Sequence, residues 1–225
     1  MGFFEKLACM LLPPRCIFCN GLIEPGIALQ VCNDCFPKIP FIEETILRTG
    51  SVDSHSVCDG AICVCKYSGI VKDSLIRFKF YSKPSYYRTF ARLISDRMGK
   101  IGSIGKFDMV MSVPLHKKKE YSRGYNQAYL ISKALGRYLK LPERSYLLKR
   151  FKNTDTQSLL GRTERRLNMM NAFKVTGSEE LKGKSILLVD DIMTTGFTLD
   201  ECARMLKEAG AVSVMAAVVA TGRKL

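Results

Sequence analysis

Residues 184–200 read KSILLVDDIMTTGFTLD, and this stretch predicts the fold of the chain around it. Ser185 to Val189 is a short apolar run with a β-branched residue, which is typical of a buried strand. Two acids, Asp190 and Asp191, follow the strand, and a loop of small hydroxylated residues around a glycine comes next. A helical pattern then runs from Leu199 to Ala209. Strand, acid pair, loop and helix in this order favour a phosphate site.

The loop between the acids and the helix has the chemistry to bind a phosphate. A helix N-terminus offers unpaired backbone N–H groups and the positive end of the helix dipole. Hydroxyl donors and a glycine that lets the backbone approach closely complete the loop: Thr194, Thr195, Gly196 and Thr198. The two carboxylates suit the hydroxyls of a sugar attached to that phosphate, and they can steer a divalent cation bound through water. The alternative is an acid pair that only ends a strand and caps a helix.

This stretch resembles the phosphoribosyl-pyrophosphate (PRPP) motif of type I phosphoribosyltransferases, in which an apolar strand ends in two acids followed by a Thr-Thr-Gly-x-Thr loop. Phe197 departs from the pattern, since a small residue is more usual there, and it could narrow the loop or pack behind it. The resemblance implies an α/β fold with a mainly parallel sheet flanked by helices, and a pocket for PRPP with Mg²⁺. Alternating strand and helix signals favour the same fold class independently.

Length and composition are those of a globular protein. The 225 residues suffice for one domain with a small appendage. The longest apolar run near the start, Leu7 to Leu12, is far below the roughly 20 residues of a membrane span, and no convincing signal peptide precedes the prolines that follow it. We therefore expect a cytoplasmic protein without a membrane span. The formal net charge of +14 favours anionic partners, although a merely basic surface is as good an explanation.

Four of the nine cysteines have the spacing of metal ligands. Cys16 and Cys19 form one pair, and Cys32 and Cys35 form a second after twelve intervening residues. Four thiolates favour tetrahedral Zn²⁺, and a site with all four positions filled is structural. A zinc ribbon over about Cys16 to Pro40 is predicted, with redox-active pairs as the alternative.

Three parts are predicted along the chain. Residues 1–40 form a short helix and the ribbon, 41–56 a linker where periodicity is lost, and 57–225 a phosphoribosyltransferase-like domain. Within the domain, apolar and helical periodicity predicts strands over 60–67, 107–113, 147–151 and 212–219, and helices over 70–80, 86–98 and up to Leu139.

A second candidate element for the site follows the strand over 107–113. A loop with His116 and the lysines Lys117 to Lys119 could cradle a diphosphate, because the carboxyl ends of parallel strands meet at one edge of the sheet. Arg123 followed by Gly124 could fold over a bound phosphate. A solvated lysine run and ordinary turn chemistry are the alternatives.

Basic residues interleaved with aromatics are typical of proteins that bind single-stranded nucleic acid. The alternative is that the aromatics pack in the core while the cations stay solvated. The candidate contacts are Arg77, Lys79, Arg88, Lys117, Lys118, Lys119, Arg162, Arg165 and Arg166.

An ordered set of motifs extends the resemblance over nearly the whole chain. They are the four-cysteine ribbon, Tyr67-Ser68-Gly69, Val113-Pro114-Leu115, Arg123-Gly124-Tyr125-Asn126-Gln127-Ala128, Thr156-Gln157 and Val189-Asp190-Asp191. The chain resembles the ComF (ComFC) family of bacterial competence proteins. That resemblance implies a cytoplasmic protein with a type I phosphoribosyltransferase fold, associated with uptake of single-stranded DNA in natural transformation, beside a helicase partner.

Two hypotheses follow, and they do not exclude each other. In the first, an enzyme binds PRPP-Mg²⁺ with its phosphate on the threonine loop and its ribose on Asp190 and Asp191. Its diphosphate then lies near His116, Lys117 and Arg123, and catalysis is positioning and charge stabilisation. In the second, the fold is kept as a module that binds single-stranded DNA. The sequence predicts no acceptor substrate.

Overall fold

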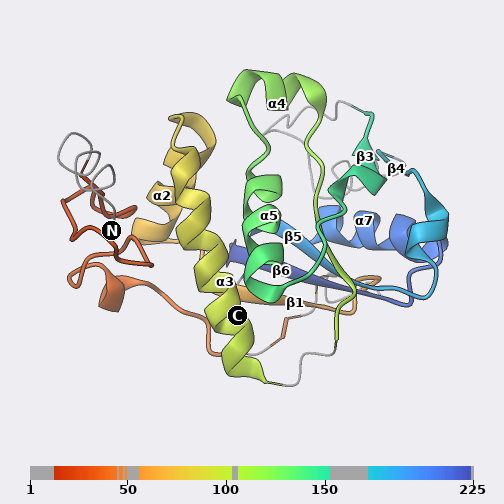
Figure 1. Cartoon of the computed structure of the whole chain (residues 1–225), viewed down its shortest axis with the longest axis horizontal. Helices are drawn as coiled ribbons and strands as arrows, with labels where there is room; N and C mark the ends of the chain where they lie inside the picture. Colours follow the sequence, from red (N-terminus) through yellow and green to blue (C-terminus); the bar gives the residue numbers. More distant parts are fainter. Residues whose placement is uncertain are drawn as a thin grey trace.

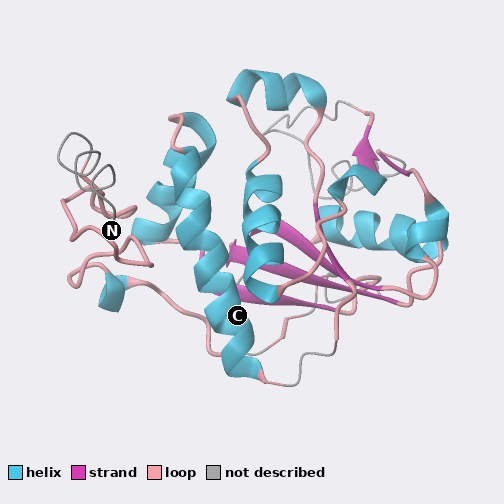
Figure 2. Cartoon of the chain, in the orientation of Figure 1, coloured by secondary structure: helices cyan, strands magenta, loops and turns pink. Residues whose placement is uncertain are grey.

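The computed structural model describes residues 13–44, 46–47, 49, 56–102, 106–152 and 172–223. Its centre is a four-stranded parallel sheet with the strand order β1-β6-β5-β2. Helices cover both faces of this sheet (Figures 1 and 2). The strands are β1 (Gly60–Lys66), β2 (Met109–Ser112), β5 (Ser185–Met193) and β6 (Ser213–Thr221). The fold class is the α/β architecture that the sequence predicts.

Each central strand is apolar almost throughout because both of its faces are buried. In β5, Leu187 and Val189 pack in one hydrophobic cluster, while Ile186 and Leu188 pack in the other. Full burial of each such side chain contributes about 1.5–3 kcal/mol. The strand runs four residues beyond its predicted end at Val189, as its bounds show, because pairing with β6 continues through Met193.

One face of the sheet carries three helices and the ribbon, which we define as residues 16–40. The helices are α2 (Gly69–Phe80), α3 (Tyr87–Ile101) and α5 (Gln127–Leu139). Figure 1 shows α3 and α5 in front of the sheet, with the ribbon beyond α2. The ribbon shares their core through Cys16, Ile17 and Phe18. These three helices match the predicted ranges closely.

The opposite face carries α7 (Phe197–Glu208) and a small antiparallel pair, β3 (Leu148–Arg150) and β4 (Phe173–Val175). Their apolar side chains share the second cluster with the sheet residues Cys63 and Val218. Short 3-10 turns connect the elements at Phe36–Lys38, Pro84–Tyr86, Ser145–Leu147 and Ser178–Leu181.

A short helix stands where a loop was predicted. This helix, α4 (Lys117–Arg123), contains all three lysines of the predicted loop. It forms because Nδ1 of His116 accepts a hydrogen bond from the backbone N–H of Lys118 at 3.3 Å, and it ends at Gly124, whose φ is 79°. The prediction of an irregular loop was therefore wrong for residues 117–119.

The segment after the ribbon lies along the outer edge of β1. Ile42 donates to the carbonyl of Val64 at 3.0 Å, and Leu47 and Ala61 exchange backbone hydrogen bonds of 2.8 and 2.7 Å.

The boundaries between the three predicted parts of the chain, after residues 40 and 56, stay predictions. Among the described residues, no helix has the length and apolarity needed to cross a bilayer. The short helix predicted ahead of the ribbon lies outside the described residues.

Candidate active site and metal cluster

The acid pair lies near the carboxyl end of β5, where the fold exposes a sheet edge to ligands. Asp190 is half-buried and Asp191 is only 6% exposed. The backbone N–H of Asp191 donates to Oδ1 of Asp190 at 2.8 Å. Oδ1 of Asp191 lies 3.0 Å from Nζ of Lys79, which comes from the end of α2. The pair is therefore held by a cation from a different part of the chain.

Nearby cations compensate the negative charge of one of the two carboxyls, Asp190, only in part. Burial, and then the charge of Asp191, raise the pKa of Asp190 to about 7, against the opposing effects of Lys79 and Arg150. A carboxyl in such a position gains from hydroxyl donors or from a cation close by, because either favours its ionised form. The site is chemically suited to a sugar diol or to a divalent ion.

The loop after β5 enters α7 through a glycine, so the N-cap residue itself brings no side chain to the first backbone N–H groups of the helix. Gly196 is the N-cap residue, with φ of 88° and no side-chain hydrogen bond to the first turn. A Cβ on Gly196 would lie 1.9 Å from the carbonyl oxygen of Thr49, so only glycine fits. Thr194 is exposed, whereas Thr195 and Thr198 are half-buried. Backbone N–H groups and hydroxyls thus meet at the start of a twelve-residue helix, as an anion site requires.

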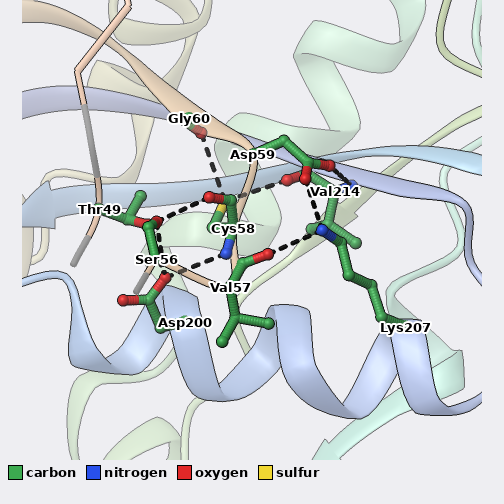
Figure 3. A network of polar contacts seen from close by, with 9 residues as sticks. All are labelled: Thr49, Ser56, Val57, Cys58, Asp59, Gly60, Asp200, Lys207 and Val214. Atoms are coloured by element: carbon green, nitrogen blue, oxygen red, sulfur yellow. Dashed lines mark hydrogen bonds and ion pairs between the residues drawn. The ribbon is translucent and has the colours of Figure 1, made fainter. Parts of the chain in front are cut away.

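A polar network ties α7 to the start of β1 (Figure 3). Oδ1 of Asp200 accepts hydrogen bonds from Oγ1 of Thr49 at 2.6 Å and from the backbone N–H of Cys58 at 3.1 Å. Nζ of Lys207 donates to the carbonyl of Val57 at 2.8 Å and pairs with Asp59. This network supports the loop from behind, because Thr49 also touches Gly196. Sequence reasoning missed it, since the partners are distant along the chain.

Four of the five residues of the Arg-Gly-Tyr-Asn-Gln motif make side-chain contacts, and Gly124 ends α4. Nη1 of Arg123 donates to Oε1 of Gln127 at 3.2 Å, and the guanidinium lies 5.1 Å from the ring centroid of Phe80. The hydroxyl of Tyr125 donates to the carbonyl of Phe78 in α2. The side chain of Asn126 caps α5 and donates to the carbonyl of Val113 at 3.1 Å. The motif therefore joins β2, α4, α5 and α2.

A cavity of about 340 Å³ opens between the end of α2 and α4, and we call it the α2–α4 cavity. Its lining is Lys79, Phe80, Ser82, Lys119, Ser122 and Arg123. Two of the residues predicted to hold a diphosphate do not line it: His116 is half-buried and caps α4, and Lys117 is exposed. Arg123 does line the cavity, so the structure brings one of the three predicted residues to it.

The predicted nucleic-acid contacts have different surroundings. Nη2 of Arg77 donates to the carbonyls of Ile17 and Phe18 in the ribbon, at 2.8 and 2.7 Å. Arg88 is exposed and lies over the ring of Tyr87, 5.6 Å from its centroid. Lys117 and Lys118 are exposed, and Lys119 is half-buried. The predicted contacts Arg162, Arg165 and Arg166 lie outside the described residues.

The four cysteines of the ribbon form one cluster. The Sγ atoms of Cys16, Cys19, Cys32 and Cys35 all lie within 4.8 Å of one another. Zn–S bonds of about 2.3 Å in a tetrahedron place sulfurs roughly 3.8 Å apart, and the Cys19–Cys32 pair is separated by 3.6 Å. Burial alone would raise the pKa of the Cys16 thiol, but backbone N–H groups outweigh it and lower the pKa to about 7. The donor set fits a tetrahedral thiolate metal such as Zn²⁺.

Comparisons with known proteins agree with this architecture. The family model described as phosphoribosyl transferase domain matches residues 122–225. Competence protein F of Haemophilus influenzae is 38% identical over 201 residues, which cover 88% of this chain and 80% of that protein. Competence protein ComFC of Bacillus subtilis is 32% identical over 187 residues, covering 83% and 70%.

Two further proteins are similar over part of the chain. DNA utilization protein YhgH of Escherichia coli strain K12 is 36% identical over 107 residues, which are 48% of this chain and 46% of that protein. Among solved structures, the glutamine PRPP amidotransferase from B. subtilis has a TM-score of 0.42 at 15% identity, covering 64% of this chain and 30% of that chain.

Proposed function

Since this chain belongs to the ComF (ComFC) family of competence proteins and has a phosphoribosyl transferase domain, we propose that it binds PRPP with Mg²⁺ and transfers or recognises the phosphoribosyl group. One observation carries the proposal. A half-buried and a buried carboxylate stand near the end of β5, before a loop that leads through the N-cap glycine Gly196 into the N-terminus of α7. Sugar hydroxyls and a phosphate are the ligands that this combination suits.

In the proposed complex, the 5′-phosphate lies at the start of α7 and accepts hydrogen bonds from the loop. The loop donors are the backbone at Gly196 and the hydroxyls of Thr194, Thr195 and Thr198. The ribose hydroxyls donate to Asp190 and Asp191. Mg²⁺ bound with PRPP neutralises phosphate charge. This arrangement holds the sugar in one orientation between two elements of the same sheet edge.

In the proposed reaction, an acceptor nucleophile forms a bond to the anomeric carbon of the ribose while the bond from that carbon to diphosphate breaks. The electron pair of the broken bond leaves with the diphosphate. The sequence predicts His116, Lys117 and Arg123 beside this diphosphate, and of the three it is Arg123 that lines the α2–α4 cavity and can stabilise the charge that accumulates there. Asp190 and Asp191 orient the ribose, so most of the catalytic effect is positioning. No side chain has to act as a covalent nucleophile.

Calorimetric titration with PRPP and Mg²⁺ tests the proposal. We expect saturable binding by the wild-type protein and a loss on the order of 100-fold in the Asp190→Asn, Asp191→Asn double variant, because two charged acceptors are removed. The matched control is Asp73→Asn with Asp96→Asn, which changes the net charge equally on exposed helix positions. Absence of binding by the wild-type protein, or equal binding by the acid-pair variant, would rule the proposal out.

A second function, binding of single-stranded DNA, is favoured by the surface of α4. That helix exposes Lys117, Lys118 and Tyr121, whose side chain is 92% exposed, so backbone attraction and base stacking are available together. A titration with oligo-deoxythymidine across a salt series tests it. Lys117→Glu with Lys118→Glu should reduce the slope of log K against log salt by at least about 1.4, since each lost phosphate contact contributes about 0.7. If the Asp190→Asn, Asp191→Asn variant lost DNA binding instead, the proposal that PRPP and DNA bind to separate surfaces would be wrong.

We further propose that the cysteine cluster holds structural Zn²⁺, supported by four sulfurs that lie within 4.8 Å of one another. A role in DNA uptake is supported by the competence names of both long relatives. A helicase partner and a cytoplasmic location stay predictions from the family resemblance.

A further inference from the structure

Lys79 belongs to two environments at once. Its Nζ lies 3.0 Å from Oδ1 of Asp191, and its side chain also lines the α2–α4 cavity. The lysine side chain is 20% exposed and Asp191 is buried, so the ion pair is shielded from most of the solvent. A buried carboxylate without a partner is strongly destabilising. Lys79 therefore stabilises the acid pair in this state of the protein.

The lining of the cavity selects for a polyanion. Three cations and two hydroxyls line it, and none of its six residues is acidic. Arg123 is already oriented, because it is hydrogen-bonded to Gln127 and stacked on Phe80. Planar guanidinium groups and mobile ammonium groups together suit adjacent phosphates. The matching ligand carries two phosphates close together.

We propose that the α2–α4 cavity is the subsite for the diphosphate of PRPP, and that Lys79 moves from Asp191 to this diphosphate when the ribose and its Mg²⁺ arrive. The inference rests on the proposed function, and it assigns the leaving group to Lys79, Lys119 and Arg123. Because the lysine ammonium sits on a flexible four-carbon stem, it can exchange partners without movement of α2. The carboxylate of Asp191 keeps a partner throughout this exchange, because Mg²⁺ and the ribose hydroxyls contact it as the ammonium group of Lys79 leaves.

The same cations could meet a phosphodiester of nucleic acid, and the position of Lys79 argues for the diphosphate. Its ammonium joins the cavity to the carboxylate that we assign to the ribose, and within PRPP the diphosphate is attached to that ribose. A ligand of that kind reaches both sites at once. A nucleic-acid backbone would bind to the cations of the cavity alone. If it drew Lys79 away, nothing would replace the lysine as the counterion of Asp191.

Three ligands measured on one variant test the inference by calorimetry. Lys79→Met should weaken PRPP-Mg²⁺ by about tenfold or more, because one charged hydrogen bond to the diphosphate is lost. Ribose 5-phosphate with Mg²⁺, which has no diphosphate, should bind the variant as tightly as the wild type or more tightly. Oligo-deoxythymidine should bind Lys79→Met as it binds the control Lys72→Met, an exposed lysine of the same helix.

Lys79→Met also removes the counterion of Asp191 and could impair folding, so a second variant is needed. Lys119→Met changes the cavity and leaves the Asp191 ion pair intact, and it should weaken PRPP and inorganic diphosphate but not ribose 5-phosphate. Equal loss of PRPP and ribose 5-phosphate, or a loss confined to the oligonucleotide, overturns the inference. If the wild type binds PRPP and both lysine variants bind it equally well, only this inference fails. If the wild type does not bind PRPP, the proposed function fails and the inference with it.

Discussion

Arg77 donates a hydrogen bond from Nη2 to the carbonyl oxygen of Ile17 at 2.8 Å. The same nitrogen donates to the carbonyl of Phe18 at 2.7 Å, and both carbonyls lie between the first two cysteines of the cysteine cluster. The ribbon is therefore attached to α2 by a charged donor as well as by the apolar contacts of its core. One guanidinium thus serves two backbone carbonyls of the segment between Cys16 and Cys19.

Removal of this guanidinium should loosen the ribbon. We expect Arg77→Met to cost about 1–3 kcal/mol of unfolding free energy, because the buried carbonyls of Ile17 and Phe18 lose their donor. Zinc release to a chromogenic chelator should also become faster. Arg92→Met is the matched control, since Arg92 is exposed and pairs with Asp96 in the next turn. Equal zinc release by both variants would contradict a supporting role for Arg77.

The loop between β5 and α7 should not tolerate a side chain at Gly196. Its φ of 88° strains any other residue by about 1–3 kcal/mol, and a Cβ would collide with the carbonyl of Thr49. Gly196→Ala should therefore lower the urea midpoint and abolish PRPP binding. Gly222→Ala is the control, because a Cβ there meets nothing within 4 Å. A Gly196→Ala protein with wild-type stability would show that the loop lies farther from Thr49.

The acid pair should make stability depend on pH near neutrality. The pKa of Asp190 is raised to about 7 in the folded chain, by burial and then by Asp191, against about 3.9 in an unfolded chain. Between these values the folded state keeps a proton that the unfolded state has lost, so stability falls as pH rises from about 4 to 7. Asp190→Asn removes this effect. Urea denaturation should show the variant stabilised by about 2 kcal/mol at pH 8 and hardly at all at pH 4. A pH-independent difference would refute the assignment.

Metal removal should affect the ribbon before the sheet. Purified protein should contain one Zn²⁺ per chain, and chelation should make the four cluster thiols reactive to a thiol reagent. Cys58, Cys63, Cys65 and Cys202 are buried in the domain core, where burial raises the pKa of each thiol, so they should stay unreactive until the domain unfolds. Thiol counts before and after chelation, with thermal unfolding of both forms, measure the effect. Simultaneous reaction of the four cluster thiols and these four core thiols would mean that ribbon and domain unfold together.

The sequence predicts those features that are local. An apolar run before two acids identifies β5, and the cysteine spacing identifies a cluster whose sulfurs do lie together. The end of β5 at Met193 was not predictable in this way, because it depends on pairing with β6. The helix over the three lysines was missed because it depends on a histidine side-chain cap, for which a lysine run gives no signal.

Within the candidate site, the residue types were predictable and their partners were not. Lys79 and Arg77 were singled out only as candidate nucleic-acid contacts, and the sequence gives no sign that one pairs with Asp191 and the other with the ribbon. The bond between Thr49 and Asp200 is a similar case. Such pairs join segments that are far apart in the chain, and only the packing of the elements reveals them.

Arg77 and Lys79 stand two residues apart on one helix, which in an α-helix places their side chains about 200° apart around the axis. One points to the ribbon and the other to the acid pair, so α2 lies between the cysteine cluster and the acid pair. The ribbon therefore supports the helix that supplies the counterion of Asp191: a displacement of α2 would also have to break the hydrogen bonds from Arg77 to the backbone of the ribbon.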